Sequence, residues 1–101
     1  MAKRLVVKAR TLPHGLPFTA QGRDAWALLE LMDAGEKGCT PIDNPGPRWS
    51  AYVFNLRGLG LAIETMHEPH RGRFAGTHAR YVLRSHVEII ARSDDDQLEA
   101  A

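Results

Sequence analysis

Several features that would place a chain in a familiar class are scarce or missing in this sequence. There is one cysteine, Cys39, so no internal disulfide can form, and a lone thiol is typical of a reducing compartment. No apolar run approaches the roughly 20 residues that a helix needs to cross a bilayer. The apolar run near the amino terminus is too short for a signal peptide. These absences predict a cytoplasmic protein without a membrane partner.

Catalytic signatures are missing as well. Glu64, His67 and Glu68 lie close together, but no serine or cysteine lies in a nucleophile motif. The glycines of residues 58–60 precede an expected strand, whereas a dinucleotide-binding loop follows a strand and opens a helix. We therefore expect no enzyme, no cofactor and no small-molecule substrate.

The histidines do not follow the spacing of a structural metal site. His67 and His70 are close in sequence, but Cys39, His78 and His86 form no second clustered pair. Structural zinc sites usually supply their ligands as two closely spaced pairs. We expect no metal, and we interpret histidines around a basic segment as pH-sensitive positive charge.

Charge is unevenly distributed along the 101 residues. The net charge is only +1, but residues 1–92 hold all 13 basic and eight of the 12 acidic side chains, a net charge of +5. The other acids form a tail of Asp94, Asp95, Asp96 and Glu99. We interpret this tail as a solvated, disordered terminus, with masking of a basic surface as the alternative. A basic body is compatible with nucleic-acid binding.

The chain does contain short periodic elements between strong breakers. Residues 3–10 predict a strand, and residues 12–17, with two prolines and a glycine, predict a connector. Thr19 is expected to cap a helix that runs to about Ala34 and stops at Gly35. Its apolar face has helical spacing and consists of Ala25, Leu28, Leu29 and Met32, widened by Trp26 and Leu31.

Two further helical segments are expected. Thr40, Pro41 and Asp43 have the features of a helix start, but the prolines of residues 44–47 should end that helix after about one turn. Residues 47–57 predict a longer helix. Its apolar face consists of Trp49, Tyr52, Val53 and Leu56.

The remaining pattern predicts a two-stranded ribbon. Residues 61–66 and 77–84 are expected to be antiparallel strands joined by a basic loop at 68–76. A third strand would come from the amino-terminal segment or from a short strand near Cys39. The expected fold class is α+β. It is a winged helix–turn–helix with three helical segments, the second very short, a small antiparallel sheet and a β-ribbon wing.

The loop and the second ribbon strand supply the stronger signal for a nucleic-acid interface. Arg71 and Arg73, with His70 beside them, are predicted to bind phosphates or the minor groove. His78 and Arg80 lie on the strand face that would extend this positive surface. The alternative is that the ribbon carries charge to stay soluble and to avoid strand-to-strand aggregation.

The polar face of the longer helix is predicted to be a recognition surface. Ser50 and Asn55 would reach base edges, and Arg48 and Arg57 would bind phosphates. Phe54 would touch a thymine methyl or, in the alternative, dock a protein partner. The other interpretation is a core helix with a small polar exterior.

Several segments resemble, in the same order, a family of small winged-helix domain proteins found in bacterial, phage-related and mobile-element genomes. These segments are Gly22–Leu28, Gly38–Asp43, Arg48–Arg57, Gly60–Thr65 and His78–Leu83. The resemblance implies a winged helix–turn–helix and, by analogy, DNA binding. Winged helices also serve as protein-interaction modules, so the family does not fix the function.

Together these observations predict three parts: an amino-terminal strand and connector at 1–18, a winged-helix domain at 19–90, and a disordered acidic tail at 91–101. The expected core consists of Trp26, Leu28, Leu29, Met32, Ile42, Trp49, Tyr52, Val53, Leu56, Ile63, Tyr81 and Leu83. We expect a small DNA-binding protein of a regulatory or mobile-element type, acting on double-stranded DNA. The alternative is a winged-helix module for protein interaction or homodimerisation.

Overall fold

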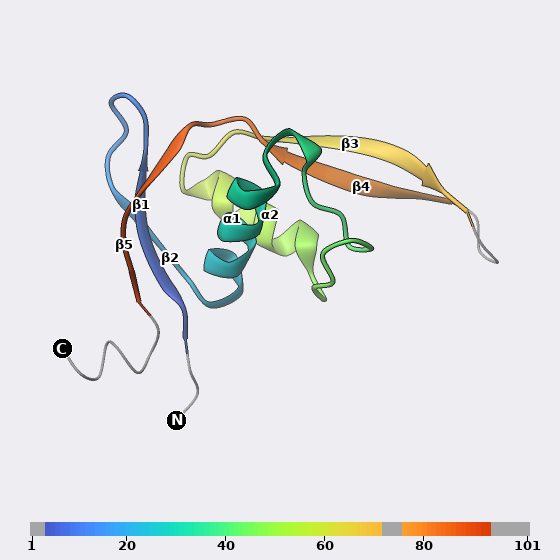
Figure 1. The fold of residues 1–101 in the computed structure, drawn as a ribbon, viewed down its shortest axis with the longest axis horizontal. Coiled ribbons are helices and arrows are strands. Elements are labelled where there is room, and N and C mark those ends of the chain that lie inside the picture. The colour runs from blue at the N-terminus through green and yellow to red at the C-terminus, as the bar shows by residue number, and fades with distance from the viewer. Residues whose placement is uncertain (1–3, 72–75, 94–101) are drawn as a thin grey trace.

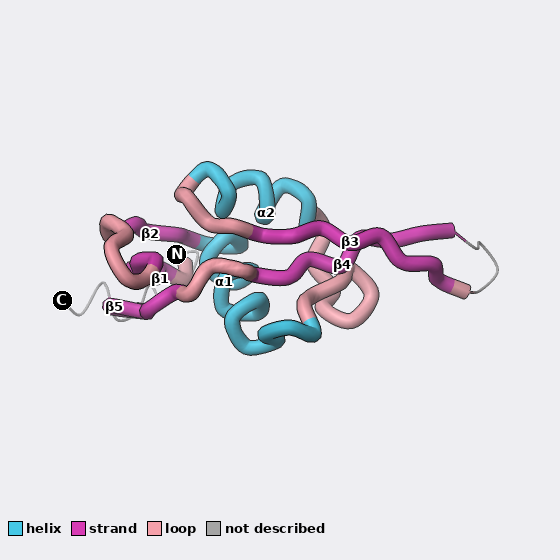
Figure 2. The backbone as a smooth tube through the Cα atoms, turned by 90° about the horizontal axis from the view of Figure 1, so that it is seen from above, coloured by secondary structure: helices cyan, strands magenta, loops and turns pink. Residues whose placement is uncertain are grey.

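A computed structural model describes residues 4–71 and 76–93, which form two small sheets with two α-helices packed beside them (Figure 1). In chain order the elements are β1 (Val6–Thr11), β2 (Phe18–Gln21), α1 (Gly22–Ala34), the 3-10 helix η1 (Gly35–Lys37), α2 (Trp49–Gly58), β3 (Ile63–His70), β4 (Gly76–Leu83) and β5 (Val87–Ser93). One antiparallel sheet has the order β2-β1-β5, and β3 and β4 form a second. Figure 2 shows the β3–β4 ribbon extending away from the helices, opposite the three-stranded sheet. No helix in the described ranges is long and apolar enough to cross a membrane.

Helix α1 begins later than predicted, because its expected first turn belongs to a strand. Thr19 lies in β2, so the prediction that it caps the helix is wrong. Residues 18–21 alternate between inward and outward positions, and this period of two satisfies their backbone groups in the ladder with β1. Gly22 makes the turn into the helix with a φ of 60°, and its amide donates to the Leu5 carbonyl at 2.8 Å. The predicted end of the helix before Gly35 is confirmed.

The predicted second helical segment is a turn, so the described chain has two α-helices and the expectation of three helical segments is wrong. The Asn44 amide donates to the Thr40 carbonyl at 2.9 Å, and the Asp43 amide donates to the Thr40 hydroxyl at 2.9 Å. These bonds close a single turn. Pro45 and Pro47 follow and have no amide hydrogen, so no second turn can form.

Helix α2 and the ribbon strands form close to their predicted positions, but the ribbon is longer. Residues 68–70, which were assigned to the loop, lie in β3, so that boundary is wrong. The strands pair over their whole length, from Ile63 opposite Leu83 to His70 opposite Gly76. Pro69 is tolerated because β3 is an edge strand, where a missing amide hydrogen faces no partner.

The ribbon is a two-stranded sheet, so the predicted third strand beside it is wrong; at Cys39, one of the two places considered, there is only an isolated bridge. Cys39 and Tyr81 exchange two backbone hydrogen bonds of 2.9 Å. Gly38 permits this approach, because its φ is 72° and a Cβ there would lie 2.5 Å from the Tyr81 carbonyl oxygen. The amino-terminal strand pairs instead with β2 and β5, so the expected single sheet is corrected to two.

Strand β5 was not predicted; apolar and polar residues alternate only over Val87–Ile89, and the alternation ends at Ile90 and Ala91. It pairs with β1, with Val6 opposite Ser93 and Thr11 opposite Val87. The strand continues past residue 91, where the tail was expected to start. Residues 94–101, which carry the four acids of the predicted tail, lie outside the described residues.

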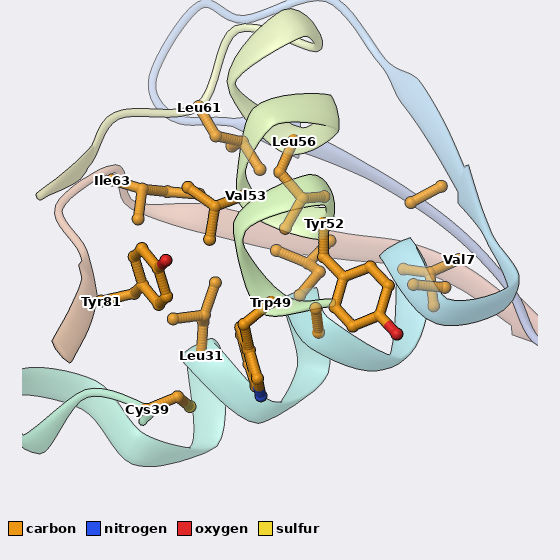
Figure 3. Close-up of a cluster of buried hydrophobic side chains, with 14 of the residues drawn as sticks. Val7, Leu31, Cys39, Trp49, Tyr52, Val53, Leu56, Leu61, Ile63 and Tyr81 are labelled. Carbon is orange, nitrogen blue, oxygen red and sulfur yellow. The ribbon is translucent and has the colours of Figure 1, made fainter. Parts of the chain in front are cut away.

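The core lies where α1, α2, the three-stranded sheet and the base of the ribbon meet (Figure 3). Burial confirms the predicted Leu28, Trp49, Tyr52, Val53, Leu56, Ile63 and Tyr81, while Trp26, Leu29, Met32 and Leu83 pack against them half-buried. Ile42 is 58% exposed, so its prediction as a core residue is wrong; it lies in the turn that replaces the second helix. Val7 and Ala9 of β1 are fully buried and were not predicted.

Candidate nucleic-acid interface

Helix α2 has one buried face and one exposed face, as its spacing predicted. Trp49, Tyr52, Val53 and Leu56 point into the core (Figure 3). Ser50, Phe54, Asn55 and Arg57 are exposed on the helix, and Arg48 is exposed just before its first turn. The chain between Asn44 and Ile63 contains no acidic residue, so the helix itself brings only positive charge to this surface.

The loop before α2, which forms in place of the predicted second helix, holds the start of α2 against α1. The Trp49 indole Nε1 donates to the Asn44 carbonyl at 2.6 Å. The Asn44 side chain accepts from the Thr40 amide at 3.3 Å and donates to Glu30 of α1 at 3.3 Å. Gly46 lies against Trp26, where a Cβ would come within 2.9 Å of the ring. The amino-terminal end of α2 is therefore fixed to α1 by side-chain contacts.

Arg57 fixes the other end of α2 to the ribbon. Its Nη2 donates to the Ile63 carbonyl at 2.5 Å and to the Thr65 hydroxyl at 2.9 Å. The guanidinium is exposed and lies between the helix and β3. Helix and ribbon are thus joined by a group whose remaining N–H donors can still face an anion.

The Asn55 side chain is hydrogen-bonded to another side chain of the same chain, a contact that the sequence does not reveal. Its Nδ2 lies 3.2 Å from both carboxylate oxygens of Asp24 on α1. This contact orients the amide and places one negative charge beside the exposed face of α2. The two residues are 31 positions apart, so no local spacing predicted the contact.

The ribbon has two faces, and His78 and Arg80 lie on the one turned away from α2. Ile63 is buried and Thr65 accepts from Arg57, so the odd-numbered residues of β3 face the helix. The register places Glu68 opposite His78 and Met66 opposite Arg80 on the other face. His78 and Arg80 therefore do not continue the exposed surface of α2.

Arg80 and His78 both bind Glu68, which the sequence had brought up only as a possible catalytic group and not as their partner. Arg80 donates to the two Glu68 oxygens at 2.9 and 2.7 Å, and to the Lys37 carbonyl at 2.8 Å. His78 Nε2 lies 2.8 Å from Glu68. Hydrogen bonds from Arg80 first, and then from His78, lower the pKa of Glu68 from 4.5 to about 2. These contacts fix the ribbon to η1 and neutralise much of the charge predicted for a DNA surface.

The described end of the ribbon carries Arg71 and His70. Arg71 is exposed, and within the described ranges it has no ion pair. His70 Nδ1 lies 3.1 Å from His78 Nδ1, and the two rings are stacked with an interplanar angle of 26°. Arg73, predicted to act with Arg71, lies outside the described residues.

Residues 4–71 and 76–93 contain no group of three or more His, Cys, Asp or Glu side chains that could hold a metal ion. Cys39 is buried, and burial, followed by the charge of Glu30, raises the pKa of its thiol to about 11. The thiol is therefore protonated near neutral pH and is a poor nucleophile.

A groove of about 670 Å³ runs between β2 and the exposed face of α2. Its lining is mostly apolar and includes Phe54, Asn55, Leu59, Thr19 and Asp24. The Phe54 ring is 76% exposed and is not part of the core, which is unusual for a large aromatic side chain. The same helix face therefore offers arginines at its two ends and an apolar ring near its middle.

Comparison with known proteins gives one family. Residues 17–93 match the family described as "Winged helix domain", which covers β2, both helices, the ribbon and β5. No curated protein and no solved structure matches the chain.

Proposed function

The chain belongs to the winged helix domain family, and from that premise we propose that it binds double-stranded DNA through α2 and the adjoining ribbon. One observation carries the proposal. Arg57 joins the carboxyl end of α2 to β3, so an acid-free helix face and the ribbon form one fixed surface. A helix held beside a ribbon is the arrangement with which winged helices engage the major groove and the neighbouring backbone.

Phosphate contacts are assigned to exposed arginines. Arg48 and Arg57 lie at the two ends of α2, and Arg71 lies at the described end of the ribbon. Arginine binds phosphate with two parallel N–H donors, and such contacts position a protein without reading sequence. Arg73 is proposed to act beside Arg71. We propose no phosphate contact for His78 and Arg80, because Glu68 already accepts hydrogen bonds from both.

Base contacts are assigned to the middle of the exposed helix face. Ser50 and the Oδ1 atom of Asn55 would accept hydrogen bonds in the major groove, and Phe54 would contact a thymine methyl. The bond from Asn55 to Asp24 restricts the amide to one orientation. Asp24 also repels phosphate, so we expect weak sequence discrimination and a modest affinity.

Fluorescence anisotropy with labelled random-sequence duplex DNA at about 50 and 200 mM salt tests the proposal, because phosphate-driven binding weakens steeply over this range. Arg48→Ala and Arg71→Ala should each reduce the salt slope by about 0.9. The matched control is Arg10→Ala, which removes the same charge from a residue paired with Glu88 in the three-stranded sheet. Slopes for Arg48→Ala and Arg71→Ala equal to that of Arg10→Ala would overturn the proposal.

A second candidate function rests on Phe54 and the groove beside it. A 76% exposed aromatic ring over an apolar groove also fits a protein partner or a second copy of the chain. An apolar interface is nearly indifferent to salt, whereas phosphate binding is not. A concentration-dependent mass that survives high salt and is lost in Phe54→Ala would favour this candidate.

A further inference from the structure

One side of strand β2 has no strand partner in residues 4–71 and 76–93. The sheet order is β2-β1-β5, so β2 pairs only with β1 and its other side is an open edge. The Gly22 amide donates to the Leu5 carbonyl at 2.8 Å, and antiparallel hydrogen bonds alternate along a strand. The peptide groups of Ala20 therefore face β1, whereas those of Thr19 and Gln21 face the open edge.

The β2 edge lacks the features that usually prevent edge strands from pairing. Phe18–Gln21 contains no charged residue and no proline, and edge strands are commonly blocked by charges, proline or a bulge. Strand β5, at the opposite edge of the same sheet, carries Glu88 and Arg92 and has an irregular register with β1. Both ribbon strands carry charged side chains, and β3 contains Pro69. Among the described strands, β2 is thus the edge best suited to pair with another strand.

The same edge borders the apolar groove beside α2. Thr19, Ala20 and Gln21 line this groove of about 670 Å³ together with Phe54 and Leu59. Figure 2 shows β2 and α2 on the same side of the molecule. Phe54 is 76% and Leu59 38% exposed. A strand added to β2 would pair its open peptide groups and also cover these two apolar side chains.

The charges of the groove favour a second copy of the chain as its occupant. One acid, Asp24, and one base, Arg57, line the groove. A partner segment with charge of one sign would be repelled by one of them, whereas a second copy related by a two-fold axis brings one acid and one base to the same patch. We propose that two copies pair antiparallel through β2, so that the sheet continues from one copy into the other and Phe54 of each copy packs at the groove of the other. This inference rests on the second candidate function and names its partner.

The backbone groups of β2 favour a pairing centred on Thr19. Gln21 is the N-cap residue of α1, and the carbonyl of such a residue accepts a hydrogen bond from the first turn of its helix. With Thr19 opposite Thr19 of the second copy, Gln21 lies opposite Pro17, which has a carbonyl to accept from the Gln21 amide and no amide hydrogen of its own. The two Thr19 residues would exchange both backbone hydrogen bonds, with their Cα atoms about 5.5 Å apart.

Sedimentation equilibrium of the full chain without DNA tests the proposal. The interface is small, so we expect a dimer with a Kd of about 10–100 μM. Thr19→Pro removes an amide that faces the open edge and not β1, and Phe54→Ala removes the exposed ring; each should weaken the dimer by about tenfold or more. The matched control is Ile90→Ala, which shortens a 45% exposed apolar side chain on β5 and should leave the Kd unchanged.

Cross-linking tests the register. Thr19→Cys should give a disulfide-linked dimer under mild oxidation, because a Cα separation of about 5.5 Å suits a disulfide. The native Cys39 is buried, and Ile90→Cys is the control that should cross-link far less.

Three results would overturn the proposal: a monomer at about 1 mM, which is far above the expected Kd; a dimer unaffected by both Thr19→Pro and Phe54→Ala; or equal cross-linking of Thr19→Cys and Ile90→Cys. A monomeric chain would still leave the second candidate function with another protein as partner, so the two can fail separately. Because the dimer would cover Phe54, the chain would bind DNA through α2 only as a monomer.

Discussion

Replacing Trp49 by phenylalanine tests whether the loop before α2, which forms in place of the predicted second helix, fixes the start of α2. Trp49 is 2% exposed, and its indole N–H donates to the Asn44 carbonyl at 2.6 Å. Phenylalanine keeps most of the aromatic packing but leaves that carbonyl without its donor. Asn44 is half-buried, so loss of the hydrogen bond to its carbonyl costs about 1 kcal/mol. The smaller ring leaves a cavity that adds about 1 kcal/mol.

The expected loss in the free energy of unfolding is therefore about 2 kcal/mol, which should lower Tm by about 10 °C in a domain of this size. Urea denaturation followed by far-UV circular dichroism measures it. Phe54→Leu is the control, because a 76% exposed ring should change stability by less than about 0.5 kcal/mol. Asn44→Ala keeps the backbone carbonyl and removes only side-chain bonds of 3.3 Å, so its loss should be smaller than that of Trp49→Phe.

A loss for Trp49→Phe no larger than that of Phe54→Leu would refute the reasoning. It would mean that the indole hydrogen bond does not fix the loop, and that packing alone places α2 against α1. If the loop does brace the helix, Trp49→Phe should also weaken DNA binding at temperatures where the variant is still folded, because the start of α2 would lose its position.

Three further predictions follow from other contacts. The double variant of Arg71→Ala with Arg73→Ala should reduce the salt slope of DNA binding by about 2, and anisotropy titrations across salt would show it. Cys39 should react with a thiol reagent far more slowly in the folded chain than in urea, because it is buried and the pKa of its thiol is raised to about 11. Glu68 has a pKa lowered from 4.5 to about 2, so its contribution to stability is present above about pH 4.5 and is lost as the pH falls towards 2. Unfolding free energy should therefore fall less steeply with acid in Glu68→Gln than in the unmodified chain; equal pH profiles would contradict the role of Glu68.

Elements defined by a long local period were predictable from the sequence. Helix α2 carries four apolar residues at helical spacing, and that face is the buried one. The start of α1 was not predictable in the same way, because Thr19 is a good helix cap and an equally good strand residue. Only the ladder with β1, formed with residues earlier in the chain, decides between the two.

In the candidate site, too, the features set by local spacing were predictable, and those set by contacts across the fold were not. Exposure of Ser50, Phe54 and Arg57 followed from the position of each residue on the helix, and the structure places all three outside the core. The partners of Asn55 and Arg80 did not follow, since Asp24 and Glu68 approach them across the fold. Counting the basic residues in the sequence therefore overestimated the number of unpaired positive side chains on the ribbon.

The three-stranded sheet joins opposite ends of the described chain. Its middle strand, β1, is the first element, and one of its two partners, β5, is the last, so that Val6 faces Ser93. Contacts between residues so distant along the chain form slowly. During synthesis, β1 must wait for the ribosome to release β5, and until then the edge of β1 that will meet β5 has unpaired backbone groups. A nascent chain that has completed both helices and the ribbon still offers a strand edge for pairing with another chain, and chaperone binding is expected at that stage.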